Sequence, residues 1–261
     1  MTTSEGRRGQ IVRELADAGC VAPDAEADEL LAAAAEGIGS IEDLVARRVG
    51  GEPLAWIVGH VRFCGLRIRV DPGVFVPRPH TEGLARRAAA LLPPAGTAVD
   101  LCTGSGAVAA VIMDARPGAT VMGTDVDPGA IACARSNGVA TLLGDLDEPI
   151  PATARGEVDV VTAVVPYVPT EELHLLPRDV LANEPRLAID GGPGGTAVLV
   201  RAAEAAARCL HLGGTVLLEI GGDQATEMRA VLAALGYDEI AVHRDEDGLD
   251  RSIEARFTRA T

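Results

Sequence analysis

The spacing of hydrophobic and polar residues divides the chain into two parts. Over residues 1–50, apolar residues recur at helical spacing. Two sets fall on common helix faces, namely Ile11, Leu15 and Ala18, and then Ala27, Leu31 and Ala34. Ser40, three residues before Asp43, has the spacing of a helix cap. This segment is therefore predicted to be a small helical bundle.

A break in this pattern follows at Gly50-Gly51-Glu52-Pro53. Residues 61–71 alternate around Cys64-Gly65 and predict a short hairpin. The two prolines of residues 77–79 keep the next stretch extended, and Thr81 or a neighbour is expected to cap a helix over 82–92. The expected domains are an N-terminal helical domain at 1–52, a hairpin and linker at 53–80, and an α/β domain at 81–261.

From Thr97 onward, short apolar runs alternate with helical patterns. Strands are predicted near 97–101, 119–124, 139–143, 157–163, 214–220, 237–243 and 251–257, and helices near 105–115, 128–137, 195–209 and 223–235. This order predicts an α/β fold with a mostly parallel, Rossmann-like sheet and right-handed crossovers. The link at 245–248 is too short for a crossover helix, so the last strand is expected to be antiparallel.

Composition narrows the classes of function. The 261 residues are 48% hydrophobic but only 2% aromatic, which predicts a core of Ala, Val and Leu. A net charge of −15 disfavours non-specific binding to nucleic acid or to an anionic membrane. The five cysteines have no metal-ligand spacing, and no secretory segment or long apolar span is visible. A cytoplasmic protein without a metal is expected.

A glycine-rich turn between the first strand of the sheet and the next helix predicts a ligand site. The turn runs from Asp100 through Cys102, Thr103, Gly104 and Ser105 to Gly106. Its glycines let the backbone approach a ligand, and the helix N-terminus offers free N–H groups. Together with Ala109, the glycines also fit the dinucleotide pattern G-x-G-x-x-A, which is a weak signal alone.

The carboxylate of Asp100 decides between two ligands. It would repel a pyrophosphate, which disfavours a nicotinamide dinucleotide, but it would attract an aminium group. S-adenosyl-L-methionine carries an aminium and a sulfonium and has no phosphate. The turn therefore favours S-adenosyl-L-methionine as cofactor.

Two more acids follow strand ends. Asp125 can accept both ribose hydroxyls of a nucleoside, while Asp127 is expected to cap the helix that Pro128 begins. Asp145 can accept from the adenine amino group, with Leu146 against the ring. Three acids at three successive strand ends fit an adenosyl ligand with a cationic tail.

A second set of residues is expected to border the reacting end of this cleft. The fourth strand of the sheet runs into Val164-Val165-Pro166-Tyr167, and Glu184 begins a later polar turn. Because the fourth strand lies beside the first, the Pro-Tyr loop is predicted to place a ring near the reacting atoms. An ordinary loop with a buried tyrosine explains these residues equally well.

The motifs together resemble a known family. In order they are Pro77-Arg78-Pro79-His80-Thr81-Glu82, Asp100 to Gly106, Asp125, Gly144-Asp145, Pro166-Tyr167 and Glu184-Pro185-Arg186. From about residue 50 onward, the chain is similar to the protein-glutamine N-methyltransferases of the HemK/PrmC type, and to a shorter subgroup without an assigned substrate. The resemblance implies a class I methyltransferase sheet, S-adenosyl-L-methionine as donor and a helical N-terminal docking domain.

The resemblance also implies site residues. The donor site is expected to comprise Asp100, Cys102, Thr103, Gly104, Ser105, Gly106, Asp125, Val126, Asp145, Leu146 and Val164. The catalytic residues are expected to be Val165, Pro166, Tyr167 and Glu184.

One departure from the family bears on the acceptor. The family loop is Asn-Pro-Pro-Tyr, and its Asn side chain and the next carbonyl accept hydrogen bonds from the substrate amide. Here Val164 replaces the Asn, and only the Val165 carbonyl remains. His80 replaces a family glutamate, and the N-terminal region looks shorter, which puts release-factor docking in doubt.

Three functions remain open from the sequence. The first is methyl transfer to an altered acceptor, an amine, carboxylate, hydroxyl or carbon acid on a small molecule, peptide or protein, with His80, His174, Glu184 or Tyr167 as base or positioner. The second is slow glutamine methylation of a release factor. The third is a cofactor-binding protein without catalysis. A nucleic-acid methyltransferase, which also uses an Asn/Asp-Pro-Pro-Tyr loop, is disfavoured by the charge and by Val164.

Overall fold

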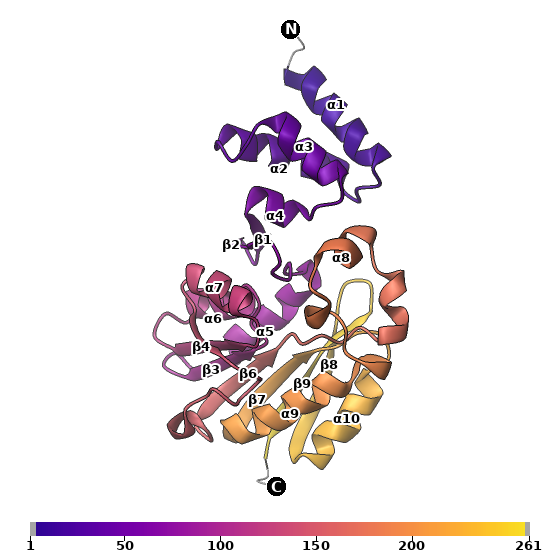
Figure 1. Cartoon of the computed structure of the whole chain (residues 1–261). Helices are drawn as coiled ribbons and strands as arrows, with labels where there is room; N and C mark the ends of the chain where they lie inside the picture. Colours follow the sequence, from indigo (N-terminus) through magenta and orange to yellow (C-terminus); the bar gives the residue numbers. More distant parts are fainter. Residues whose placement is uncertain (1–3, 259–261) are drawn as a thin grey trace. The chain divides into compact units, whose positions relative to one another are not determined.

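A seven-stranded sheet is the centre of the larger of two units in this computed structural model, which describes residues 4–258 (Figure 1). The larger unit comprises Val61–Leu175 and Glu184–Thr261, and the smaller comprises Met1–His60 and Leu176–Asn183. The strands of the sheet are β3 (Thr97–Leu101), β4 (Thr120–Asp125), β5 (Ala140–Leu143), β6 (Val158–Ala163), β7 (Leu210–Glu219), β8 (Tyr237–Arg244) and β9 (Asp250–Phe257).

Five α-helices and a hairpin complete the larger unit. The helices are α5 (Glu82–Leu91), α6 (Ala107–Ala115), α7 (Pro128–Ser136), α9 (Ala197–Cys209) and α10 (Ala225–Ala234). The hairpin consists of β1 (His60–Phe63), whose first residue is assigned to the smaller unit, and β2 (Leu66–Arg69). Short 3₁₀ helices are η1 (Pro79–Thr81), η2 (Ala152–Ala154), η3 (Thr170–Leu175), η4 (Arg186–Ala188) and η5 (Pro193–Gly195).

The strand order confirms the predicted fold class. The order is β5-β4-β3-β6-β7-β9-β8, with parallel pairs from β5 to β7 and with β9 antiparallel to both its neighbours. The reversal is possible because the β8–β9 link is a tight turn, in which the Asp245 carboxylate accepts the N–H groups of Asp247 and Leu249 at 3.0 Å. β7 begins at Leu210, earlier than predicted, because Leu210 pairs with Val158 before a shift in register.

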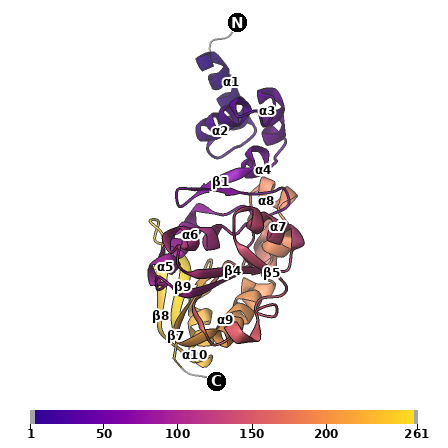
Figure 2. The same cartoon turned by 90° about the vertical axis from the view of Figure 1, so that its left-hand side faces the viewer.

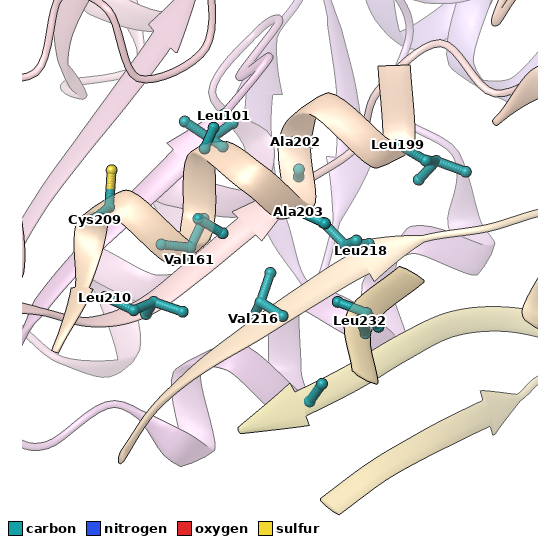
Figure 3. Packing of buried hydrophobic residues seen from close by; sticks show 14 of the residues in the cluster. Leu101, Val161, Leu199, Ala202, Ala203, Cys209, Leu210, Val216, Leu218 and Leu232 are labelled. Atoms are coloured by element: carbon teal, nitrogen blue, oxygen red, sulfur yellow. The ribbon is translucent and has the colours of Figure 1, made fainter. Parts of the chain in front are cut away.

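Helices cover both faces of the sheet. One face packs against α5, α6 and α7, and the other against α9 and α10 (Figures 1 and 2). Figure 3 shows the second face, where Ala202 and Ala203 of α9 lie against Val161 of β6 and Leu218 of β7. Alanines allow α9 to approach the sheet closely, as the low aromatic content predicts.

The helical unit has its own core. It contains α1 (Ser4–Asp17), α2 (Pro23–Ala35), α3 (Ile41–Val49), α4 (Leu54–Val58) and α8 (Arg178–Asn183). Ile11, Leu15 and Ala27 are fully buried, as the pattern predicts. The prediction is wrong for Ala18, which is exposed beyond the end of α1, and Leu31 and Ala34 are only half-buried.

On α2 the buried face is shifted by one residue from the predicted one. Glu26, Leu30 and Ala33 are buried instead of Leu31 and Ala34. The cause is an ion pair, because the Glu26 carboxylate accepts from Arg48 of α3 at 2.6 Å. Burying this pair turns the helix toward Glu26.

A segment far along the chain completes the helical unit. Arg48 also lies 3.4 Å from the Asp179 carboxylate of α8, and the Asn183 side chain donates to the Gly51 carbonyl at 2.9 Å. The helical domain expected at 1–52 ends before α4, whereas the compact unit continues to His60 and takes in residues 176–183. Nothing in the local sequence pattern around 176–183 indicates this association.

Two of the three predicted helix caps are present. The Ser40 hydroxyl accepts from the Asp43 N–H, and the Asp127 carboxylate accepts from the Gly129 N–H at 2.8 Å. Thr81 does not cap α5, because its backbone is already helical and its side chain is buried. Within residues 4–258, no helix is long and apolar enough to cross a membrane, and no three metal-ligating side chains cluster.

Candidate functional site

A cavity of about 250 Å³ opens where β3, β4, β5 and β6 end at their carboxyl termini. This is where parallel α/β sheets bind ligands. Its walls come from Phe63, from residues 75–81, 100–108, 125–130, 145–146, 164–166 and 185–188, and from α9. The predicted donor-site residues that line it are Asp100, Cys102, Thr103, Gly104, Ser105, Asp125, Val126, Asp145, Leu146 and Val164.

The glycine-rich turn has the tight backbone that the sequence predicts. Cys102, Gly104 and Gly106 all have left-handed φ values, of 54°, 56° and 80°. Gly106 begins α6, and a Cβ there would lie 2.9 Å from Val139 of the neighbouring segment. Burial raises the pKa of the Cys102 thiol far above its usual value, so this cysteine stays protonated and unreactive.

Asp100 faces the cavity but already has protein partners. The side chain is 2% exposed, and its oxygens accept from the hydroxyls of Thr103 at 2.6 Å and Thr162 at 2.7 Å. Burial raises the pKa of this carboxyl to about 6 despite both hydrogen bonds. A cation in the cavity would favour the ionised form of Asp100. An aminium group fits this electrostatic requirement, and a pyrophosphate does not.

Asp125 connects the turn to the second strand end. Its carboxylate accepts from the Gly104 N–H at 2.9 Å and from the Asp127 N–H at 3.0 Å. Burial raises the pKa of this carboxyl as well. Each oxygen keeps acceptor capacity, so a diol that donates two hydroxyls fits this group.

Asp145 lies at the third strand end and pairs with a residue that the sequence did not indicate. Its carboxylate forms a short ion pair with Arg201 of α9, which also lines the cavity. Leu146 is buried with a left-handed φ of 47° and contributes an apolar surface beside it. The pairing leaves Asp145 with acceptor capacity, and it makes the guanidinium of Arg201 a second polar group at this end.

The loop after β6 is only partly directed at the cavity. Val164 and Pro166 line it, whereas Val165 is 2% exposed and packs in the core beneath α9. The Tyr167 hydroxyl lies 3.4 Å from His80 Nε2, and its carbonyl accepts from the Gln224 side chain at 2.8 Å. Tyr167 is not among the cavity-lining residues of the described chain.

Glu184 is held by an arginine. Its carboxylate accepts from Arg78 at 2.6 Å and from the Val76 N–H at 3.3 Å, and its side chain is 1% exposed. These bonds join the segment 75–81 to the segment 184–188 on one side of the cavity. The geometry gives Glu184 a positioning contact rather than a place on the cavity wall.

Thr81 is a site residue for which the sequence predicted a different role. Its side chain is 4% exposed, lines the cavity, and has a hydroxyl without a hydrogen-bond partner among the described residues. A buried polar atom without a partner is costly unless a ligand or water satisfies it. Its place in the Pro-Arg-Pro-His-Thr-Glu motif was the available signal. No signal in the sequence indicated that Arg201, Phe63 and Phe75 would line the cavity.

Comparison with known proteins identifies the family. A Moorella thermoacetica release factor glutamine methyltransferase is 35% identical over 272 residues, which cover 95% of this chain and 96% of the relative. The Geobacter sulfurreducens relative of that name is 34% identical over 85% of this chain and 79% of its own length. The Bordetella pertussis relative is 38% identical over 80% of this chain and 79% of its own length. The chain belongs to the release factor glutamine methyltransferase family.

The Moorella alignment corrects one expectation about this family resemblance. Similarity was expected from about residue 50, but 95% coverage of the chain includes most of the helical segment as well. The expectation of a shorter N-terminal region is therefore no argument against release-factor docking. No family model matches the chain.

Solved structures agree on the fold. A ribosomal protein L11 methylase from Lactobacillus delbrueckii subsp. bulgaricus superposes on 74% of this chain, and on 86% of its own, with a TM-score of 0.52 at 19% identity. A chain of the E. cuniculi Mtq2–Trm112 complex covers 71% of this chain, and 99% of its own, with a TM-score of 0.53 at 23% identity. The protein is a class I methyltransferase that uses S-adenosyl-L-methionine.

Proposed function

We propose that this enzyme transfers the methyl group of S-adenosyl-L-methionine to an acceptor other than a primary amide. The observation that carries the proposal is that Val164 lines the cavity, at the position where the resemblance described above implies an Asn. A valine side chain cannot accept a hydrogen bond. The wall that would face an amide therefore lacks one of the two acceptors that would hold its hydrogens.

The residues around Val164 support the same proposal. Apart from Thr81, the lining residues of the segments 75–81, 164–166 and 185–188 are apolar: Phe75, Pro77, Val164, Pro166, Pro185, Leu187 and Ala188. An amide nitrogen is a poor nucleophile because its lone pair is delocalised. An amine or a carboxylate has a localised lone pair, and a hydroxyl or a carbon acid becomes nucleophilic when it loses a proton to a base, so none of them needs an Asn to free an amide lone pair. Catalysis of its methylation rests mainly on alignment with the sulfonium.

The donor is expected to be held by residues already described. S-adenosyl-L-methionine supplies the electrophilic methyl group when bound. Asp125 would accept from the ribose hydroxyls, and Asp145 and Leu146 would contact the adenine. Asp100 and the glycine-rich turn would hold the cationic amino-acid end, and the free hydroxyl of Thr81 supplies a further donor. Val165 and Pro166 would contribute backbone near the acceptor, while Tyr167 and Glu184 act by positioning.

An acceptor screen with methyl-labelled S-adenosyl-L-methionine tests the proposal. The panel contains small amines, carboxylic acids, alcohols and peptides, together with a release factor that carries the Gly-Gly-Gln segment. We expect transfer to at least one non-amide class and background transfer to glutamine. Tight cofactor binding without transfer to any non-amide acceptor contradicts the proposal.

The substitution Val164→Asn sharpens the screen. Restoring one preorganised polar contact is expected to raise glutamine methylation on the order of 100-fold. Val164→Leu is the matched control, since it changes size without adding an acceptor. It should leave glutamine methylation at background.

Slow glutamine methylation of a release factor is the second candidate. It is favoured by family membership, since relatives of that name are 34–38% identical over most of their length. In this case, the wild-type enzyme methylates the Gly-Gly-Gln glutamine measurably and Val164→Asn accelerates it. Glutamine methylation that stays at background in both proteins excludes this candidate.

Calorimetry distinguishes the third candidate, a non-catalytic cofactor-binding protein, from the two enzyme candidates. Binding of S-adenosyl-L-methionine without turnover on any panel member supports it, whereas absence of binding excludes all three functions. Membership of the shorter subgroup and a cytoplasmic location stay predictions from the sequence.

A further inference from the structure

His80, Glu219 and Tyr167, the last residue of the loop 164–167, form a partly buried cluster outside the cavity lining. The Nε2 atom of His80 lies 3.4 Å from Oε1 of Glu219 and 3.4 Å from the Tyr167 hydroxyl. Glu219 is 1% exposed, and its Oε1 atom has no hydrogen-bond partner among the described residues. The cluster therefore contains a buried carboxylate whose charge requires compensation.

The sheet places this cluster next to Val164. β6 and β7 are parallel, and Ala163 pairs with Leu218, so Val164 is level with Glu219 on the neighbouring strand. Side chains level with each other in such a pair point to the same face of the sheet. Val164 and Leu217 both pack on the face that α5 and α6 cover, which is the face Glu219 also shares.

The charged groups around the cluster identify His80 as the counterion. Arg78, from the segment before η1, is bound to Glu184 at 2.6 Å. Arg251 of β9 is bound to Asp245 at 2.6 Å. Both arginines influence the Tyr167 hydroxyl, but each is paired with a different carboxylate. The imidazolium form of His80 is therefore the group that can neutralise Glu219.

Tyr167 connects the charge state of the His80–Glu219 pair to the loop 164–167. Its carbonyl is fixed by Gln224, and its ring lies so close to Gly221 that a Cβ there would be 2.9 Å from it. Burial, followed by the charge of Glu219, raises the pKa of the Tyr167 hydroxyl, so this group stays protonated and available as a donor. With the hydroxyl also held, both ends of the residue after Pro166 are fixed.

We propose that His80 and Glu219 are positioning residues for methyl transfer, and that protonated His80 and Glu219 together hold the Tyr167 hydroxyl and so fix the loop 164–167 along the donor cavity. The inference deepens the proposed function and rests on it. No proton passes to the substrate. Loss of the imidazolium proton leaves the carboxylate without its counterion, and the loop then loses order.

The tyrosine content allows a direct test. The chain has two tyrosines, so protein labelled with ¹³C at the tyrosine Cζ gives two signals, and Tyr237→Phe assigns them. We expect the Tyr167 signal to move with pH as the charge of the His80–Glu219 pair changes. The movement should be absent in His80→Gln and in Glu219→Gln.

A matched control uses a second histidine–carboxylate pair. His243 lies 2.9 Å from Glu254 on β9, away from the cavity lining, so His243→Gln should leave the Tyr167 titration unchanged. His80 is 25% exposed on its side chain, so His80→Gln is expected to fold even if Glu219→Gln does not.

A second measurement connects the pair to the donor cavity. Because Val164 and Pro166 line that cavity, the affinity for S-adenosyl-L-methionine, relative to that of His80→Gln, should fall about fivefold when His80 loses its proton. The double variant His80→Gln/Glu219→Gln should lose no more affinity than either single variant.

Two outcomes overturn the inference. One is a Tyr167 signal that does not move with pH in the wild-type protein, or that still moves in His80→Gln. The other is additive loss of affinity in the double variant. Neither depends on the identity of the acceptor, so the inference and the proposed function fail separately.

Discussion

The two sides of the cavity differ in how they are built. On the side proposed to hold the donor, Asp100, Asp125 and Asp145 lie at or next to the ends of three successive strands, and each carboxylate has a defined protein partner. On the side proposed to face the acceptor, the segments 75–81, 164–166 and 185–188 present apolar side chains and one hydroxyl without a hydrogen-bond partner in the described part of the chain. The donor side is polar and prearranged, whereas the acceptor side offers shape with little hydrogen bonding.

The difference shows that the sheet fixes the positions of the residues on the donor side but not of those on the acceptor side. Strand ends of a parallel sheet meet at one edge, so the positions of the donor-side acids follow from the strand order. The acceptor side depends on contacts between distant segments, such as Arg78 with Glu184, which are 106 residues apart. Its chemistry can therefore change while donor binding is retained.

Asp125→Ala tests the donor side with the largest expected effect. Removing an ionised acceptor of two hydroxyl hydrogen bonds should weaken S-adenosyl-L-methionine binding about 100-fold, measured by calorimetry. Asp114→Ala, an exposed aspartate on α6, is the matched control and should bind normally. A loss below about threefold would mean that Asp125 does not hold the ribose.

Gly106→Ala tests the backbone of the turn. The φ of 80° and the 2.9 Å approach to Val139 should together lower the free energy of unfolding by about 2–3 kcal/mol in urea titrations. Gly138→Ala has a similar φ of 82° with nothing within 4 Å, so it should cost only about 1 kcal/mol. Equal losses in the two variants would show that the close approach does not matter.

The pH dependence of S-adenosyl-L-methionine binding tests whether the Asp100 carboxylate interacts with the aminium group of the donor. The pKa of the Asp100 carboxyl rises from 3.8 to about 6 on folding, so the folded state holds a proton between these values that the unfolded chain has released. The free energy of unfolding therefore decreases as pH rises through this window. A bound aminium favours the ionised form, so S-adenosyl-L-methionine affinity, relative to that of Asp100→Asn at the same pH, should increase about tenfold from about pH 5 to about pH 7.5.

The variant Asp100→Asn isolates this effect from the other acids. Its affinity, measured by calorimetry over the same range, should lack the tenfold increase. An identical pH profile in the variant would assign the dependence to another group, such as Asp125, whose carboxyl pKa is also raised by burial.

The variant Thr81→Val has the smallest expected effect. It tests whether Thr81, which lies between the two sides of the cavity, contacts the donor. Losing a neutral hydrogen bond should weaken S-adenosyl-L-methionine binding about fivefold, while the free energy of unfolding without ligand stays equal or increases. Thr124→Val is the control, because its buried hydroxyl also lacks a partner in the described chain but does not line the cavity. Equal affinity changes in both variants would exclude contact between Thr81 and the donor.

The sequence predicted the sheet and the positions of the three acids at its strand ends, because both follow from periodicity. The apolar runs before Asp100, Asp125 and Asp145 mark their strand ends, and the reversed last strand follows from the short turn at Asp245. Such patterns are local in the sequence. The parallel pairing of the strands brings their carboxyl ends together at one edge of the sheet.

The remaining features depend on contacts that a local pattern does not contain. The pairing of Arg201 with Asp145 joins α9 to a strand end 56 residues earlier, and nothing in the helix pattern distinguishes Arg201. The buried Glu26–Arg48 pair shifted the face of α2, and Thr81 became part of the cavity wall instead of a cap. Each outcome was set by tertiary packing.

The association of residues 176–183 with the N-terminal helices has a consequence for synthesis on the ribosome. The helices α1 to α4 emerge early, but Arg48 cannot meet Asp179 until 131 further residues have been translated. The chain passes between the two units three times, at residues 60, 175 and 183. An N-terminal fragment ending at residue 60 therefore lacks part of its own unit, and co-translational maturation of that unit must wait until β3 to β6 have been made.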